Sequence, residues 1–434
     1  MKSNWLKPSG IIIIIVALLM TTILSNLRWH GEDWKTTLGS DARGYYAPLP
    51  ATFIYGDLNY GFFEEIELKK YFNSNQMFDY RSIQEGGVTN KFYCGTAIAE
   101  APFFLLGHLW SHTSDKDTDG YSWYYMIFIS LSGVFYLMLG LIYTNKLLDF
   151  YDIKEWHKVI VLVVTVFGTN LFYYAIVEVG TSHIFSFAFV AMFVYFSKLF
   201  FTSDKAKYSI ILAALLGMIV LIRPINGMII FSLPFMAGSW EAFSRSTLNL
   251  LKRPFNFLLA LLLFFGVVSI QLFIYKISVG SFFIYSYTDE GFDFLHPHFI
   301  DILFSYKKGL FLYTPMYLLA FVGLWYLWNK SKYMMITWLL FFVMITYILS
   351  SWWSWYYGGS FSSRVYVEYL PLFAILIGVA LRDMKRRAIY ISVISILLVV
   401  CQIQTYQYRY YDIHWSDMTK DKYWNVFLRI DRLM

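Results

Sequence analysis

A carboxylate in a polar, turn-prone segment is the first candidate for chemistry in this sequence. Asp41 lies in the string GSDARGYY, in which two glycines favour a turn. A carboxylate held there could act as a general base toward a bound hydroxyl or amine, and Tyr45 and Tyr46 could contact the same substrate. An isolated loop acid is more often simply solvated. Asp57, in the string YGDL, has the same two interpretations and is the second candidate.

Basic residues that could hold a phosphate recur farther along the chain. Lys91 precedes an apolar stretch, so its ammonium could bind phosphate at the level of lipid headgroups or simply snorkel to the interface. Arg223 precedes Pro224, which interrupts an otherwise apolar double segment. Arginine can bind phosphate with two hydrogen bonds, and a helix-end anchor is the equal alternative. Lys307, in YKKGL, could also meet a phosphate.

The most unusual string is SWWSWYYGGSFSSR, residues 351–364. Rings such as Trp355 and Tyr356 could stack on a sugar, and Arg364 could bind the phosphate attached to it. A belt of aromatic residues at a membrane interface would explain the tryptophans. It would not explain the paired glycines and Arg364, so the string favours ligand binding.

Two further candidates lie in the string VEVGTSH between two apolar runs, namely Glu178 and His183. Ionisable groups at the ends of membrane spans are functional candidates, and a structural histidine bonded to a neighbouring helix is the alternative. The H-x-H pair at 296–298 with distant acids is a weak metal signature. We therefore assign no metal ligands and no certain cofactor, a divalent metal being the open alternative. Cys94 and Cys401 are expected to be buried thiols.

Membrane-spanning helices must position these groups. The 434 residues are 58% hydrophobic and only 15% charged, which excludes a soluble domain and indicates an all-α polytopic membrane protein. The net charge of +6 is assigned to membrane topology, so no nucleic-acid partner is inferred. Apolar runs predict about eleven spans, at 10–27, 122–145, 159–177, 182–201, 208–222, 225–238, 255–275, 313–328, 333–350, 366–381 and 389–405.

The placement of charge predicts the orientation of these spans. With a cytoplasmic N-terminus, every cytoplasmic connection is rich in Lys or Arg, while the acidic break 112–121 lies outside. This requires the short apolar stretch 96–110 to lie along the membrane surface or dip into it. The predicted organisation is one membrane domain, 1–434, with outer loops 28–121 and 276–312 and an outer tail 407–434. All the candidate groups then lie on the extracytoplasmic face, and we prefer a bacterial inner membrane.

This layout resembles the GT-C superfamily of membrane glycosyltransferases, and in particular its protein O-mannosyltransferase and lipid A aminoarabinose transferase branch. The matching features are Asp41 in a long first outer loop, the stretch 91–109, Arg223 before Pro224, and the string GGSFSSR before a late span. The resemblance implies a polyprenyl-phosphate sugar donor and an inverting transfer outside the cytoplasmic membrane. It makes Asp41 the base and makes Lys91 and Arg364 ligands of the donor phosphate. The acceptor would be a glycan, a lipid or a protein, and membrane lipids would surround the chain.

A transporter or flippase of a lipid-linked sugar is the alternative interpretation, because basic groups and aromatic rings within a membrane would serve it equally well. The sequence shows no internal repeat, and the polar candidates are predicted to gather on one face. Both features favour chemistry at the membrane surface. A structural membrane subunit with incidental loop charges is the third interpretation.

Overall fold

The computed structural model describes residues 7–71, 78–203 and 205–432, and it is 71% helical. Within these residues the strands are β1 (Arg81–Gln84) and β2 (Gly87–Asn90), which pair as an antiparallel hairpin with Ile83 opposite Val88. The predicted helical membrane class is therefore confirmed, and a small hairpin in the first outer loop is added to it.

Seven helices within the described residues are long and apolar enough to cross a membrane, and they make the chain an integral membrane protein. They are α1 (Pro8–Arg28), α5 (Trp123–Asp149), α8 (Ser182–Ser203), α12 (Pro254–Val279), α16 (Lys332–Ser350), the continuous pair η7 (Arg364–Tyr369) and α17 (Leu370–Asp383), and α18 (Arg387–Arg409).

The other predicted spans form shorter helices, so the count of eleven stays a prediction. The run 159–177 is divided because α6 (Glu155–Phe167) ends at Gly168 before α7 (Leu171–Ile176) begins. Pro224, which cannot donate a backbone hydrogen bond, separates α9 (Lys207–Ile222) from η6 (Pro224–Ser232) and α10 (Leu233–Ala237). The run 313–328 becomes α14 (Leu310–Tyr313) and α15 (Met316–Lys330).

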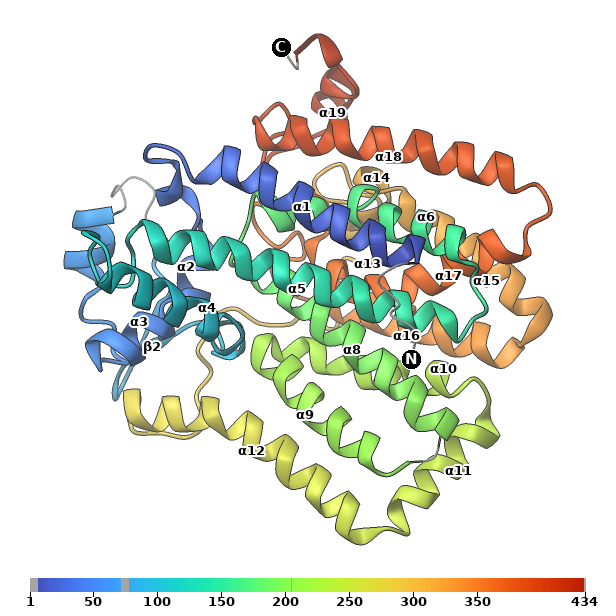
Figure 1. Ribbon diagram of the computed structural model, residues 1–434, viewed down its shortest axis with the longest axis horizontal. Coiled ribbons are helices and arrows are strands. Elements are labelled where there is room, and N and C mark those ends of the chain that lie inside the picture. The colour runs from blue at the N-terminus through green and yellow to red at the C-terminus, as the bar shows by residue number, and fades with distance from the viewer. Residues whose placement is uncertain (1–6, 72–77, 204, 433–434) are drawn as a thin grey trace.

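The first outer loop folds as a unit with its own aromatic core. It contains η2 (Asp33–Thr36), α2 (Asp41–Tyr46), α3 (Pro48–Pro50), η3 (Ala51–Tyr55), η4 (Phe63–Tyr71) and α4 (Gly95–His112). Tyr46, Tyr80, Phe104 and Tyr121 are among its fully buried rings. Figure 1 shows these blue and teal elements gathered at one end of the helical bundle. The loop is therefore a packed cap over the helix ends.

Contacts at the helix ends include ion pairs on one side of the bundle and close backbone packing on the other. In the connections predicted to be cytoplasmic, Lys158 pairs with Asp149 of the same connection at 2.7 Å, and Lys330 pairs with Asp383 of another connection at 3.0 Å. On the opposite side, the end of α12 meets the β-hairpin, where a Cβ on Gly86 would lie 2.0 Å from the carbonyl oxygen of Val279. Which side faces the cytoplasm stays a prediction.

The remaining elements connect the bundle. They are α11 (Trp240–Leu251) between α10 and α12, α13 (Phe299–Phe304) in the second outer loop, and α19 (Lys420–Val426) with η8 (Ile430–Arg432) in the tail. The large apolar core lies within the bundle, where α17 is almost completely buried. The rigid core holds the outer ends of α8, α9, α12 and η7 in fixed positions beneath the first loop.

Candidate functional site

A cavity of about 320 Å³ lies where the first loop, the second outer loop, the junction of α9 with η6, and the segment 352–364 meet. We call it the central cavity. Five of the candidate residues, from four distant segments of the sequence, line it, namely Asp41, Tyr45, Lys91, Arg223 and Arg364. The structure therefore gathers the proposed base and three of the four proposed phosphate ligands into one space.

Asp41 and Arg364 form an ion pair in the lining of the central cavity. Nη2 of Arg364 donates to Oδ2 of Asp41 at 2.7 Å, and the two side chains are only 14% and 17% exposed, respectively. Asp41 begins α2 directly after Ser40, whose φ is 45°. Among the described residues the buried Nε of Arg364 has no hydrogen-bond partner. Arg364 also lines the cavity, where a bound ligand could contact its side chain.

The turns before Arg364 explain how a residue at the start of η7 reaches Asp41. Tyr357, Gly358 and Ser362 all have positive φ angles, of 53°, 66° and 58°. Glycine adopts this region without steric cost, so Gly358 suits the bend. The amide of Asn170 lies 3.3 Å from the carbonyl oxygen of Ser363. These contacts fix the backbone from which Arg364 extends.

Glu178 is the second acid beside Arg364. Its Oε2 lies 3.9 Å from Nη1 of Arg364. Burial raises the pKa of Glu178 to about 7, and the charge of Arg364 opposes that shift. Arg28, at the end of α1, donates a hydrogen bond to the carbonyl oxygen of Val177 and so ties the Glu178 loop to the first loop. Arg364 therefore stands between two carboxyl groups, one of which titrates near neutral pH.

Arg223 is held by a buried carboxylate that the sequence analysis missed. Its Nη1 lies 3.3 Å from Oε1 of Glu368, which is fully buried, and Nδ1 of His183 lies 3.0 Å from the same oxygen. His183 thus helps to position Arg223 through Glu368, and it does not line the cavity. An acid within the apolar run 366–381 was the signal in the sequence, because charges inside spans are rarely incidental.

Lys91 connects the two outer loops at the cavity. Its Nζ lies 2.6 Å from Oε1 of Glu290 and 5.3 Å from the centre of the Tyr287 ring. Ser286 donates to the backbone carbonyl of Lys91 at 2.8 Å, which holds the loops together next to the ion pair. Glu290 and Tyr287 also line the cavity and were not assigned from the sequence.

The aromatic string forms one wall of the central cavity, but the rings in this wall are not the predicted Trp355 and Tyr356. Trp352 and Trp353 line the cavity beside Tyr287, whose ring centre is 5.7 Å from that of Trp352. Trp355 instead lies against His298, with ring centres 5.4 Å apart. The ring centre of Tyr356 lies 3.4 Å from Nζ of Lys307. Which rings of the string line the cavity could not be read from its composition.

The remaining candidates lie outside the central cavity. Tyr46 is buried in the core of the first loop and donates to the carbonyl oxygen of Gly120. Asp57 accepts backbone hydrogen bonds from Asn59 at 2.8 Å and Gly61 at 2.7 Å, so its carboxylate stabilises a turn. Burial lowers the pKa of Lys308, the neighbour of Lys307, to about 7, and its Nζ donates to the carbonyl oxygen of Ser360.

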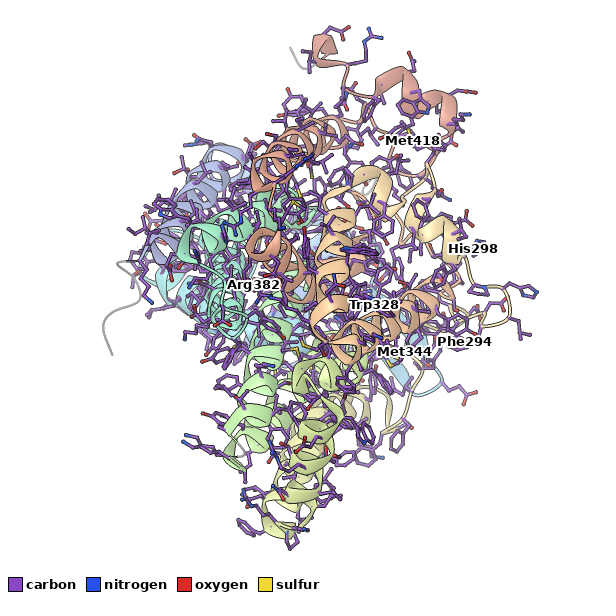
Figure 2. The ribbon with its side chains drawn as sticks, turned by 90° about the vertical axis from the view of Figure 1, so that its right-hand side faces the viewer. Phe294, His298, Trp328, Met344, Arg382 and Met418 are labelled. Atoms are coloured by element: carbon purple, nitrogen blue, oxygen red, sulfur yellow. The ribbon has the colours of Figure 1, made fainter. Side chains whose placement is uncertain are left out.

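The residues around the cavity do not fit a divalent metal well. Within the part of the chain that the structure describes, no group of three or more His, Cys, Asp or Glu residues could hold one. The carboxylates of Asp41 and Glu290 already form ion pairs with basic side chains, Arg364 and Lys91, respectively. His296 and His298 pair with nearby aspartates in an exposed loop, and Figure 2 shows His298 at the edge of the molecule. Cys94 and Cys401 are buried free thiols, as expected.

Comparison with known proteins identifies the fold. No protein-family model and no curated protein matches the sequence. Three solved structures of the oligosaccharyltransferase of Archaeoglobus fulgidus do match. The form tethered by a disulfide bond to an acceptor peptide with the NVT sequon has a TM-score of 0.50 and 10% identity, and the match covers 98% of this chain and 57% of that chain.

The other two structures of that enzyme give similar values. The apo form has a TM-score of 0.48 at 11% identity over 98% of this chain and 57% of that chain. The complex with zinc and sulfate has a TM-score of 0.47 at 11% identity over 95% and 54%. This chain therefore spans a little more than half the length of the enzyme that it matches. The predicted GT-C fold is therefore confirmed by the likeness to the acceptor-tethered structure, and this likeness shows the fold alone.

Proposed function

We propose that the protein is an inverting glycosyltransferase. It would move a sugar from a polyprenyl-phosphate donor to a glycan, lipid or protein acceptor on the extracytoplasmic face of a bacterial inner membrane. The observation that carries the proposal is the convergence of Asp41, Lys91, Arg223 and Arg364 in the central cavity from four distant segments. An acid next to several cations suits a reaction that takes a proton from one substrate and releases a phosphate from the other.

The donor would place its phosphate among the cations and its sugar along the aromatic wall. Arg223 and Arg364 present planar guanidinium groups that match phosphate oxygens, and Lys91 supplies a third positive charge. Trp352, Trp353 and Tyr287 offer ring faces to the sugar, while Tyr45 lies on the side of Asp41. Lys307 lies over Tyr356 outside this cavity and has no part in the proposed binding of phosphate.

The reaction would proceed by displacement at the anomeric carbon. Asp41 takes the proton of the acceptor hydroxyl or amine as that atom attacks, and the bond from the carbon to the phosphate oxygen breaks. The phosphate leaves with the bonding electron pair, and the arginines stabilise its growing charge. Attack from the face opposite the phosphate inverts the anomeric configuration. The cavity is only partly open, so its protein walls strengthen each of these electrostatic interactions relative to water.

Donor binding would also prepare the base. Asp41 accepts a hydrogen bond from Arg364 at 2.7 Å. A donor phosphate that draws the guanidinium toward itself frees a lone pair of Asp41 for the acceptor. The mechanism therefore favours binding of the donor before the acceptor is deprotonated.

The test is sugar transfer from radiolabelled polyprenyl-phosphate donors by the full-length protein in detergent, comparing wild type, Asp41→Asn and the control Asp33→Asn. Asp33 is an exposed acid of the same loop, in η2. We expect Asp41→Asn to lower the transfer rate by a factor on the order of 10² to 10⁴ with donor binding retained, and Asp33→Asn to match wild type.

Two outcomes would contradict the proposal. Undiminished transfer by Asp41→Asn would remove that carboxylate from the mechanism and would direct attention to Glu178. No transfer by the wild type with any donor, together with movement of a lipid-linked sugar across vesicle membranes, would establish the flippase interpretation instead.

A further inference from the structure

A second hollow, of about 680 Å³, lies at the outer ends of α1 and α5, apart from the central cavity. We call it the outer hollow. Five aromatic residues from three regions of the chain line it, namely Trp29, Trp34, Tyr71, Trp123 and Tyr124. Figure 1 shows the neighbouring ends of α1 and α5 at the edge of the molecule that carries the first loop. Nothing in the proposed transfer reaction accounts for this collection of rings.

The rings of the outer hollow are fixed at different angles. Trp34 and Tyr71 meet edge to face, with centres 5.9 Å apart, and Trp123 and Tyr124 do so at 4.9 Å. Nε1 of Trp123 donates to the backbone carbonyl of Trp29 at 3.0 Å, which ties α5 to the end of α1. All five side chains are partly exposed. Fixed ring faces at a wet surface suit the apolar C–H faces of sugar rings.

Charged groups around the rings balance one another. Nζ of Lys70 lies 2.9 Å from Oδ2 of Asp117, and Nζ of Lys35 lies 2.5 Å from Oε2 of Glu32. The lining contains three acidic residues, Glu32, Asp115 and Asp117, and three basic residues, Lys35, Lys70 and Lys116. A balanced lining favours a neutral ligand with many hydroxyl groups, because each hydroxyl can both donate and accept a hydrogen bond. The central cavity, with three cations and two acids in its lining, differs in this respect.

A belt of interfacial aromatic residues explains only part of the lining. Trp29 and Trp123 lie at helix ends, where such a belt is expected. Trp34 lies in η2, beyond the end of α1, and Tyr71 ends η4, so neither belongs to a span. The ion pairs of Lys35 and Lys70 lie beside these two rings. The arrangement therefore extends into the folded loop.

The lining of the outer hollow is linked to Asp41 and Glu178 by short stretches of chain and one hydrogen bond. Trp29 follows Arg28, which donates to the carbonyl oxygen of Val177, the neighbour of Glu178. Lys35 precedes Asp41 by six residues, a length of chain that spans at most about 20 Å. An extended ligand of a few sugar rings could cover such a distance.

We propose that the outer hollow binds a neutral oligosaccharide, as the part of a glycan acceptor that does not react. The role as acceptor site rests on the proposed glycosyltransferase function, whereas the binding of saccharide does not. Binding energy from remote sugar rings would hold the acceptor while its reacting hydroxyl lies at Asp41. Among the three acceptor classes of the proposed function, this selects a glycan.

The test measures binding of fluorescein-labelled tetrasaccharides of glucose, mannose, galactose and N-acetylglucosamine to the full-length protein in detergent, by fluorescence anisotropy. The variants are Trp34→Ala, the conservative Trp34→Phe, and the control Trp240→Ala. Trp240 is an exposed tryptophan on α11, far from the first loop in Figure 1. We expect at least one tetrasaccharide to bind wild type and the control equally. Trp34→Ala should weaken that binding about tenfold or more, and Trp34→Phe should retain most of it.

Transfer kinetics distinguish this inference from the proposed function. With a tetrasaccharide acceptor, Trp34→Ala should raise KM about tenfold and leave kcat nearly unchanged, while Asp41→Asn should lose transfer and keep saccharide binding. Unchanged binding by Trp34→Ala, or no binding by wild type, would overturn the inference even if Asp41-dependent transfer is observed. If Trp34→Ala loses phospholipid that co-purifies with the wild type, and saccharide binding does not change, the outer hollow is a site for lipid headgroups. This result would also overturn the inference. Saccharide binding without Asp41-dependent transfer would refute the proposed function alone.

Discussion

At the scale of single residues, the central cavity compensates each of its cations with a carboxylate. Arg364 pairs with Asp41, Arg223 with Glu368, and Lys91 with Glu290. A partly buried cation without such a partner would be strongly destabilising, so these pairs stabilise the charged lining of the cavity. The same pairs mean that a donor phosphate must compete with carboxylates for every cation. Selectivity for a bound anion therefore depends on the strength of these three pairs.

Glu178 leads to a prediction about stability and pH. Burial raises its pKa from 4.5 to about 7, so between these values the folded protein holds a proton that the unfolded chain has released. The stability contributed by this proton is fully present below pH 4.5 and is lost as the pH rises through 7. Over this range the free energy of unfolding falls by up to about 3 kcal/mol, because each unit of pKa difference corresponds to about 1.36 kcal/mol.

Thermal unfolding in detergent between pH 4.5 and 8 tests this prediction. The midpoint of the wild type should fall more steeply over this range than that of Glu178→Gln, which carries no titrating proton at this position. Parallel curves for the two proteins would show that Glu178 is not buried in the manner described.

At the scale of secondary-structure elements, interruptions of helices place the functional groups. Pro224 ends α9, which leaves Arg223 in an extended conformation with φ of −153°. The turn through Gly358 brings Arg364 back toward the first loop. These interruptions lie where the helices meet the packed cap, so continuous helices carry the fold and their ends carry the site.

Close contact between α15 and α17 gives a second prediction. Gly323 of α15 packs directly on α17, and an added Cβ would lie 1.9 Å from the carbonyl oxygen of Leu376. Because a backbone atom cannot move aside alone, Gly323→Ala must separate the two helices. We expect it to lower the free energy of unfolding by about 1–3 kcal/mol, measured as a lower thermal midpoint.

Gly266 supplies a matched control for this substitution. It also lies within a membrane helix, α12, but no heavy atom of another element lies within 4 Å of its added Cβ. Gly266→Ala should leave the midpoint unchanged or raise it slightly, because alanine restricts the unfolded chain. Equal effects of the two substitutions would contradict the close approach of α15 and α17.

At the scale of the whole molecule, polar chemistry is confined to one end of the helical bundle. The central cavity and the outer hollow both lie against the first loop, whereas the opposite helix ends carry pairs such as Lys158 with Asp149. The excess of Lys and Arg at those opposite ends is typical of cytoplasmic connections. This asymmetry is the basis for assigning the site to the extracytoplasmic face.

Single cysteines would test the orientation directly. Glu85, at the tip of the hairpin, and Lys385, between α17 and α18, are both exposed, and the native Cys94 and Cys401 are buried. In intact cells, a maleimide that cannot cross the membrane should label Glu85→Cys, and it should label Lys385→Cys only after the cells are opened. The reverse pattern would place the site in the cytoplasm and would exclude a donor on the outer face.

The sequence by itself determined the membrane class, most of the helices and the chemical types at the site. Long apolar runs exclude water and must form helices, so α5, α8 and α12 lie close to their predicted ranges. Lys91 and Arg223 could be selected because they adjoin apolar runs, where charges are costly. Asp41 could be selected from its turn-prone glycines, and Arg364 from the paired glycines and aromatic residues before it. The run 96–110 was recognised as a helical stretch too short to be counted among the spans, and it forms α4.

Only the tertiary structure decided which of these groups meet. Glu368 holds Arg223 across 145 residues of sequence, and Arg364 reaches Asp41 across 323. Trp352 and Trp353, in place of Trp355 and Tyr356, line the cavity because the backbone turns within the aromatic string set the direction of each ring. Local sequence fixes hydrophobicity and turn preference over a few residues, whereas contacts between distant segments depend on how all the helices pack together.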